Sequence, residues 1–191
     1  IENGAHLEAF TYIEGPAYIG KNSKILGGKV TACSIGHNCK IAGEVSNSIF
    51  LSYSNKAHAG FIGHSYICEW VNLGAMTTNS NLKNTYSEIK LNLGKEQVNT
   101  NQIFLGAMIG DYVKTGIGTL LNTGSIIGFG STLFGPNIHD KYIAPFTWGE
   151  KGNYGKHQLD KFFQTAVKMM LRRGQELTVA ESEVIEELNN G

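Results

Sequence analysis

IENGAHLEAFTYIEGPAYIGKNSKI, residues 1–25, carries an isoleucine or leucine at every sixth position. The same period returns further along the chain, at Ile35, Ile41, Ile62, Ile67, Leu73, Ile109, Thr115, Leu121, Ile127 and Leu133. An α-helix repeats every 3.6 residues and a strand every two, so neither accounts for one aliphatic residue in six. Three six-residue units close a triangular coil whose aliphatic residues fill a shared interior. We therefore predict an all-β fold, a left-handed parallel β-helix of hexapeptide repeats, over residues 1–135.

Two segments interrupt the repeat. In residues 78–102, Asn79, Thr85 and Gln97 stand where aliphatic residues are expected, and we predict a loop inserted into the β-helix. Residues 136–155 contain two prolines and several glycines, which predict an irregular connection. The chain after residue 135 is therefore expected to leave the β-helix.

A helical hairpin is expected at the C-terminal end of the segment 136–191. Residues 156–173 have the period of an amphipathic helix, and its apolar face consists of Leu159, Phe162, Phe163, Ala166, Met169 and Met170. Thr178 and Glu181 form a capping box that begins a second helix near residues 179–189. The residues of this helix expected to face inward are Val184, Ile185 and Leu188. Because terminal repeats need a cap, we expect the hairpin to cover the open end of the β-helix.

The composition excludes several classes of function. Sixteen basic and sixteen acidic residues leave no net charge, so no broad electrostatic footprint exists for nucleic acid or an anionic membrane. The three cysteines are odd in number and form no CxxC pair, which fits a cytoplasmic protein without a disulfide framework. Because the chain opens in mid-pattern, we expect a nucleotide-binding α/β domain with a glycine-rich phosphate loop upstream.

The most specific motif is NKAHAGFIGHSYICEWVNLGAMTTNSN, residues 55–81. His58 precedes the aromatic–aliphatic–glycine step at residues 61–63, and Asn72 lies in the segment VNLGAMT. These residues resemble the C-terminal acyltransferase domain of bifunctional sugar-1-phosphate nucleotidyltransferases of the N-acetylglucosamine-1-phosphate uridyltransferase type. The resemblance implies acetyl transfer from acetyl-CoA to an amino-sugar or sugar-1-phosphate acceptor.

The resemblance also implies roles for individual residues. An imidazole can take the proton of an attacking amine at neutral pH, and His58 matches the family's general base. Glu44 matches a carboxylate that orients this imidazole. Asn72 and Lys90 are expected at the substrate. The residues expected to bind acetyl-CoA, through close approach of the backbone, are Ala75, Asn81, Gly116 and Gly135.

The family further implies a homotrimer that acts on a small sugar substrate. No metal ligands are expected in this chain, and Mg²⁺ is expected only if a nucleotidyltransferase domain precedes it. His64 lies six residues after His58, on the next face, and is expected to be a bystander or to pack on the loop.

Several residues depart from the family pattern. Three lie in the expected pocket, where a tyrosine, a lysine and a tyrosine are replaced by Phe61, Ser46 and Leu82. The chain's two arginines, Arg172 and Arg173, both lie in the expected C-terminal helix, so the coil lacks the arginine that the family uses for the sugar phosphate. Lys24 or Lys29 would replace it as a point charge. Otherwise the sugar lacks a phosphate, or the site has lost its activity.

Two other functions remain open. The γ-type carbonic anhydrases share this fold and bind zinc through histidines between subunits, but their paired histidines stand five apart rather than the six that separate His58 from His64. The non-enzymatic alternative is a domain that only trimerises a sugar-1-phosphate nucleotidyltransferase.

Overall fold

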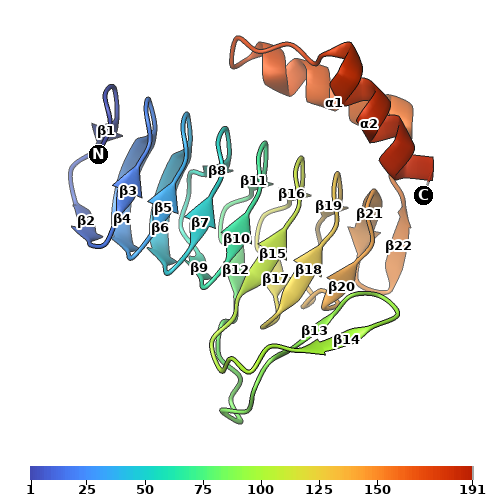
Figure 1. Ribbon diagram of the computed structural model, residues 1–191, viewed down its shortest axis with the longest axis horizontal. Coiled ribbons are helices and arrows are strands. Elements are labelled where there is room, and N and C mark those ends of the chain that lie inside the picture. Colours follow the sequence, from blue (N-terminus) through green and yellow to red (C-terminus); the bar gives the residue numbers. More distant parts are fainter. Residues whose placement is uncertain (191) are drawn as a thin grey trace.

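The computed structural model describes residues 1–190 and consists mainly of short parallel strands stacked into successive coils (Figure 1). We name three rows of strands. Face 1 contains β3 (Tyr18–Ile19), β5 (Ser34–Ile35), β7 (Ile49–Phe50), β10 (Tyr66–Ile67), β15 (Ala107–Ile109), β18 (Ser125–Ile127) and β20 (Tyr142–Ile143). Face 2 contains β1 (His6–Leu7), the first halves of β4 (Lys24–Thr31) and β6 (Lys40–Ser46), β8 (Asn55–Lys56), β11 (Asn72–Leu73), β16 (Lys114–Thr115), β19 (Thr132–Leu133) and β21 (Thr147–Glu150).

Face 3 completes each coil, with β2 (Thr11–Glu14), the second halves of β4 and β6, β9 (Phe61–Gly63), β12 (Thr78–Asn79) and β17 (Leu120–Leu121). Strands on successive coils pair in parallel, and inward-pointing residues such as Leu73, Ile109 and Ile127 fill the shared interior. The predicted β-helix of hexapeptide repeats is confirmed.

The interior also contains aliphatic and aromatic residues that the six-residue period did not find. Val30, Val45 and Phe50 are all buried. They follow the preceding inward residue by only five, four and five positions, because the corners of these coils are shorter. By contrast, Ile1 and Leu7 follow the six-residue period but are exposed. They belong to the first coil, which has a neighbour on one side only.

The β-helix continues beyond residue 135. Ile143 in β20 lies in register with Ile127, and β21 pairs with β19. β22 (Asn153–Lys156) then turns back antiparallel to β21, and Tyr154 from this hairpin packs against the end of the interior. The expectation of an irregular connection at residues 136–155 is corrected: the two prolines lie in turns between strands.

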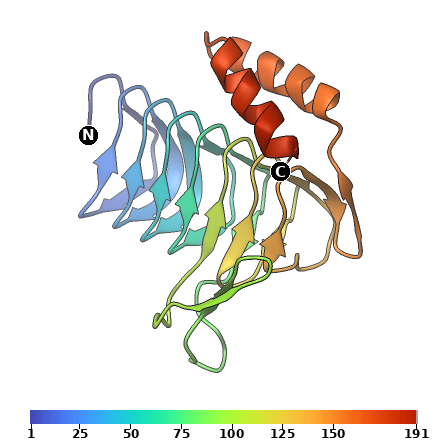
Figure 2. The same ribbon diagram turned by 45° about the vertical axis from the view of Figure 1, so that its right-hand side comes forward.

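The helices lie beside the β-helix, along its long axis, rather than over its open end (Figures 1 and 2). α1 (Leu159–Leu171) and α2 (Val179–Asn190) cover edge 1–2, the corner that joins face 1 to face 2. There, a ladder of corner aromatics consists of Tyr53, Trp70, Tyr112, Phe129 and Phe146, with Tyr53 and Trp70 stacked at 4.3 Å. The expected helical cap of the open end is therefore corrected, because the apolar face of α1 packs on this ladder through Phe162, Ala166 and Met170.

The second helix begins as expected. Thr178 Oγ1 accepts a hydrogen bond from Glu181 N at 3.2 Å, and Glu181 Oε2 accepts one from Thr178 N at 2.8 Å, which is the predicted capping box. Of the three residues expected to face inward, Ile185 is buried, whereas Val184 and Leu188 are exposed. The helix therefore uses a narrower apolar stripe than its sequence suggested.

The inserted loop is shorter at its beginning than expected. Asn79 belongs to β12, and the backbone N–H of Ser80 still donates to Leu121 O on the next coil at 2.9 Å. The buried Asn79 amide accepts from Gly63 N at 2.9 Å and donates to Gly63 O at 3.0 Å, which satisfies a polar side chain in an aliphatic position. The loop begins after Ser80, forms a hairpin of β13 (Lys90–Asn92) and β14 (Gln97–Asn99), and rejoins the coil before β15.

Lys56 occupies an inward position on face 2 and is 1% exposed. Its ammonium group donates to Ala42 O at 2.7 Å and to His58 O at 2.9 Å. Burial without a carboxylate partner disfavours the charged form and lowers the pKa of Lys56 to about 8. The charge of this buried amine therefore depends on pH.

We predict that wild-type protein gains stability over a Lys56→Met variant as the pH rises from 8 to 10. In that window the unfolded chain holds the Lys56 proton and the folded chain has lost it, so the difference in unfolding free energy should rise by about 1.4 kcal/mol per pH unit. Urea denaturation at several pH values measures this difference. Lys29→Met, which removes an exposed lysine, should show no such trend, and a pH-independent difference for Lys56→Met would refute the assignment.

Candidate functional site

Four of the predicted residues lie along edge 2–3, the corner that joins face 2 to face 3. His58 follows β8, while Ala75, Gly116 and Gly135 follow β11, β16 and β19, and these four strands are adjacent in face 2. The backbone ladder continues around the corner, since Met76 N donates to Ala59 O and Gly118 N donates to Ala75 O, both at 2.8 Å. Residues far apart in sequence are thus aligned on successive coils.

The glycines on this edge are also required by packing. A Cβ on Gly116 would lie 3.0 Å from Phe134 Cβ. Gly135 has a φ of +93°, and a Cβ there would lie 2.5 Å from Glu150 Oε2. Larger side chains are therefore disfavoured, because Phe134 and Glu150 already occupy the space beside these two glycines.

His58 and Glu44 do not contact each other in the described part of the chain. The His58 side chain is exposed and makes no hydrogen bond within residues 1–190, while its carbonyl oxygen accepts from Lys56. Glu44 is exposed on face 3, where it lies opposite Phe61 of the next coil. One chain therefore presents the imidazole and the carboxylate on neighbouring coils without the hydrogen bond that would orient the ring.

Asn72 lies on the outer surface of face 2, toward the opposite edge from His58. It is in register with Asn55, whose amide donates to Asn72 Oδ1 at 3.4 Å. Asn55 Oδ1 in turn accepts from Arg173 at the end of α1 at 2.7 Å. Asn55 and His58 are three residues apart, which corresponds to roughly 10 Å of extended chain. The structure thus places Asn72 beside the C-terminal helix.

The predicted residues of the inserted loop lie elsewhere. Lys90 is exposed in β13, opposite Asn99. The Asn81 amide is 2.9 Å from His64 Nδ1, and the His64 ring stacks on Phe104 with centroids 5.1 Å apart. Burial under these contacts lowers the pKa of His64. His64 packs on the loop, as expected, and Asn81 serves as its partner.

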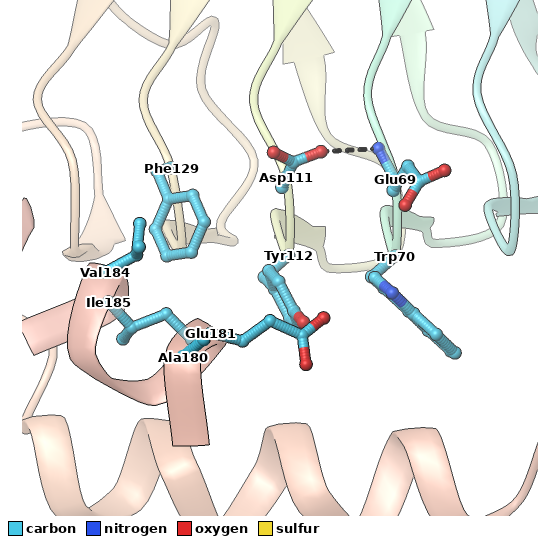
Figure 3. A pocket seen from close by; sticks show the side chains of 9 residues that line it. All are labelled: Glu69, Trp70, Asp111, Tyr112, Phe129, Ala180, Glu181, Val184 and Ile185. Carbon is cyan, nitrogen blue, oxygen red and sulfur yellow. Dashed lines mark hydrogen bonds between the residues drawn. The ribbon is translucent and has the colours of Figure 1, made fainter. Parts of the chain in front are cut away.

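Sequence reasoning missed a pocket of about 340 Å³ between α2 and edge 1–2 (Figure 3). Trp70 and Tyr112 form its aromatic wall, and the carboxylates of Glu69, Asp111 and Glu181 surround it. Asp111 Oδ1 accepts a hydrogen bond from Glu69 N at 2.7 Å, and burial raises the pKa of both acids. The residues that line this pocket come from turns and from α2, so no local sequence motif indicates it.

Within residues 1–190 no group of three or more histidine, cysteine, aspartate or glutamate side chains is arranged to hold a metal ion. In the same range no helix has the length and apolar character needed to cross a membrane.

By sequence, the chain is similar to part of several bifunctional proteins. No family model matches it. It is 36% identical over 85 residues to a bifunctional sugar-1-phosphate nucleotidylyltransferase/acetyltransferase of Sulfurisphaera tokodaii, a match that covers 44% of this chain and 21% of that protein. It is also 36% identical over 88 residues to the bifunctional protein GlmU of Methanococcus aeolicus, covering 46% of this chain and 21% of the relative. The match thus spans about a fifth of these relatives.

Among solved structures, the chain resembles AntD, an N-acyltransferase from Bacillus cereus crystallised with dTDP and 3-hydroxybutyryl-CoA. The TM-score is 0.51, the sequence identity is 14%, and 88% of each chain is covered, so this likeness concerns the fold alone. The resemblance predicted from the histidine and asparagine motifs is confirmed by the sequence relatives: the chain is similar to part of the bifunctional sugar-1-phosphate nucleotidyltransferase/acetyltransferases.

Proposed function

We propose that this chain transfers an acetyl group from acetyl-CoA to an amino-sugar or sugar-1-phosphate acceptor, as the C-terminal part of a sugar nucleotidyltransferase-like protein. One observation carries the proposal: His58 and the small residues Ala75, Gly116 and Gly135 share edge 2–3. The name of the Sulfurisphaera tokodaii relative, which combines nucleotidylyltransferase and acetyltransferase, supports the same class of reaction.

The edge suits a long, flexible thioester. Its half-buried small residues follow one another over several coils, so acetyl-CoA would lie along the edge with its thioester near His58. Backbone N–H groups in such a position stabilise the negative charge that develops on the thioester oxygen. Binding of the cofactor and activation of the acceptor then involve different groups.

In the proposed reaction the acceptor amine attacks the thioester carbon and its proton passes to the His58 imidazole. The tetrahedral intermediate collapses, the C–S bond breaks, and the imidazolium returns the proton to the departing CoA thiolate. The His58 ring has no hydrogen-bond partner within residues 1–190 and is therefore free to take this proton.

The site is expected to be completed by a second copy of the chain in a homotrimer. Exposed apolar side chains gather on edge 2–3 and the adjoining part of face 3, namely Met76, Ile117, Leu120 and Phe134. Burial of such a patch between copies would be favourable. A neighbouring copy would also supply the orienting contact that His58 lacks in one chain.

His58→Ala should lower kcat by roughly 10²- to 10⁴-fold, the usual contribution of a positioned general base. Acetyl-CoA affinity should stay within about twofold, because the cofactor is held by the backbone of the edge. Thiol release measured over a panel of amino sugars, with and without a 1-phosphate, tests both quantities. The matched control is His6→Ala, which removes an exposed histidine of the first coil. An active His58→Ala variant would exclude this base, and wild-type protein that binds acetyl-CoA but acetylates nothing would favour a non-catalytic trimerisation domain.

Light scattering should give a mass of three chains of 20.8 kDa each. Ile117→Asp should dissociate this trimer, because Ile117 is 81% exposed in the single chain and lies in the proposed interface. Val179→Asp provides the control, since Val179 is 76% exposed but lies on α2, at the far edge. A monomeric wild-type protein, or equal effects of the two substitutions, would contradict the proposed interface.

A further inference from the structure

The outer surface of face 2 is basic and lies beneath the end of α1. Its outward residues are in register from coil to coil, in the order Lys24, Lys40, Asn55, Asn72 and Lys114. α1 runs back along the β-helix (Figure 2), and its last turn lies over this row, where Arg173 donates to Asn55. A pocket of about 330 Å³ lies between them, with cationic groups from Lys40, Lys114, Lys168, Arg172 and Arg173 and the amide of Asn72.

Within residues 1–190 no carboxylate lines this pocket, which we call the basic pocket. The ion pairs of the described chain, His37 with Glu2 and Lys151 with Asp140, lie elsewhere. Mutual repulsion is evident at Lys40, whose pKa is lowered first by Arg173 and then by burial. At Lys114, burial alone lowers the pKa to about 8.

These cations do more than attach the helix. Arg173 does serve as an anchor, since its guanidinium donates to Asn38 O at 3.1 Å and to Asn55 Oδ1 at 2.7 Å. By contrast, the side chains of Arg172, Lys168 and Lys40 make no hydrogen bond in the part of the chain that the structure describes. Helix attachment would be easier without like charges on both sides of the contact. An anion bound between these like charges would neutralise them.

We propose that the basic pocket binds the phosphate group of a small phosphorylated ligand. A phosphate offers several acceptor oxygens and up to two negative charges, which suit converging guanidinium, ammonium and amide donors. The cavity volume is close to the lower limit of small-molecule sites, which fits a phosphate together with one small ring. Both arginines of the chain, absent from the coil itself, contribute to this pocket. The proposal concerns binding and does not require His58 to be catalytic.

Titration calorimetry on the full chain at low ionic strength tests the proposal with three sets of probes. These are inorganic phosphate alone, glucosamine 1-phosphate against glucosamine, and CoA against 3′-dephospho-CoA. In at least one pair, the phosphate-bearing member should bind at least tenfold more tightly. Discrimination within the sugar pair identifies a sugar phosphate as the ligand, and discrimination within the CoA pair identifies the 3′-phosphate of CoA.

The double variant Lys40→Gln/Arg172→Gln should lower the affinity for inorganic phosphate and for the discriminated ligand at least tenfold. Arg172 is exposed and makes no side-chain hydrogen bond in the described chain, so the fold should persist, which circular dichroism checks. Lys161→Gln removes an exposed cation from α1 outside the basic pocket and should change the affinity less than twofold. Absence of discrimination in both pairs, or an equal loss with Lys161→Gln, would overturn the proposal.

Discussion

The structure depends on one packing constraint: every coil must place three side chains into a narrow interior that it shares with its neighbours. This constraint explains the aliphatic period and the glycines whose Cβ atoms would meet the next coil. It also favours partners for polar inward residues, and three of them have such partners, whereas the buried His139 Nε2 has none within residues 1–190. Lys56 donates to two carbonyl oxygens. The Asn79 amide bonds to both the N–H and the carbonyl oxygen of Gly63, and the hydroxyls of Thr115 and Thr77 lie 2.7 Å apart. Stacking in register then aligns outward residues from distant parts of the sequence.

The sequence predicted the β-helix because the period reports directly on what points inward. It could not locate Val30, Val45 and Phe50, since shortened corners change the spacing without changing the interior. For the helices, the sequence did not predict where they pack. Amphipathicity identified the apolar face of α1, but not the surface that it covers, because the corner aromatics such as Tyr53 and Trp70 come only once per coil, and the inserted loop interrupts their spacing. The end of the interior is covered by Tyr154 and its hairpin instead.

The candidate site was likewise predicted only in part from the sequence. A local motif and the register together bring His58 and the small residues of edge 2–3 into one line, and sequence alone suggested these residues. The orienting contact from Glu44 is not made within one chain. Asn72 lies instead beside the basic pocket, because Arg172 and Arg173 return to face 2 from the end of the chain. No sequence pattern relates these arginines to Lys40, since only the packing of α1 on edge 1–2 brings them together. Edge 2–3 and the basic pocket thus occupy opposite sides of the same face.

A crystal structure of the protein with CoA bound tests the proposed site on edge 2–3 most directly. We predict that the pantetheine lies along edge 2–3, past Gly135, Gly116 and Ala75, with its sulfur within a few ångströms of the His58 imidazole. We further predict that a second copy of the chain covers the bound cofactor. CoA bound away from this edge, or a His58 ring turned away from the sulfur, would contradict the central claim.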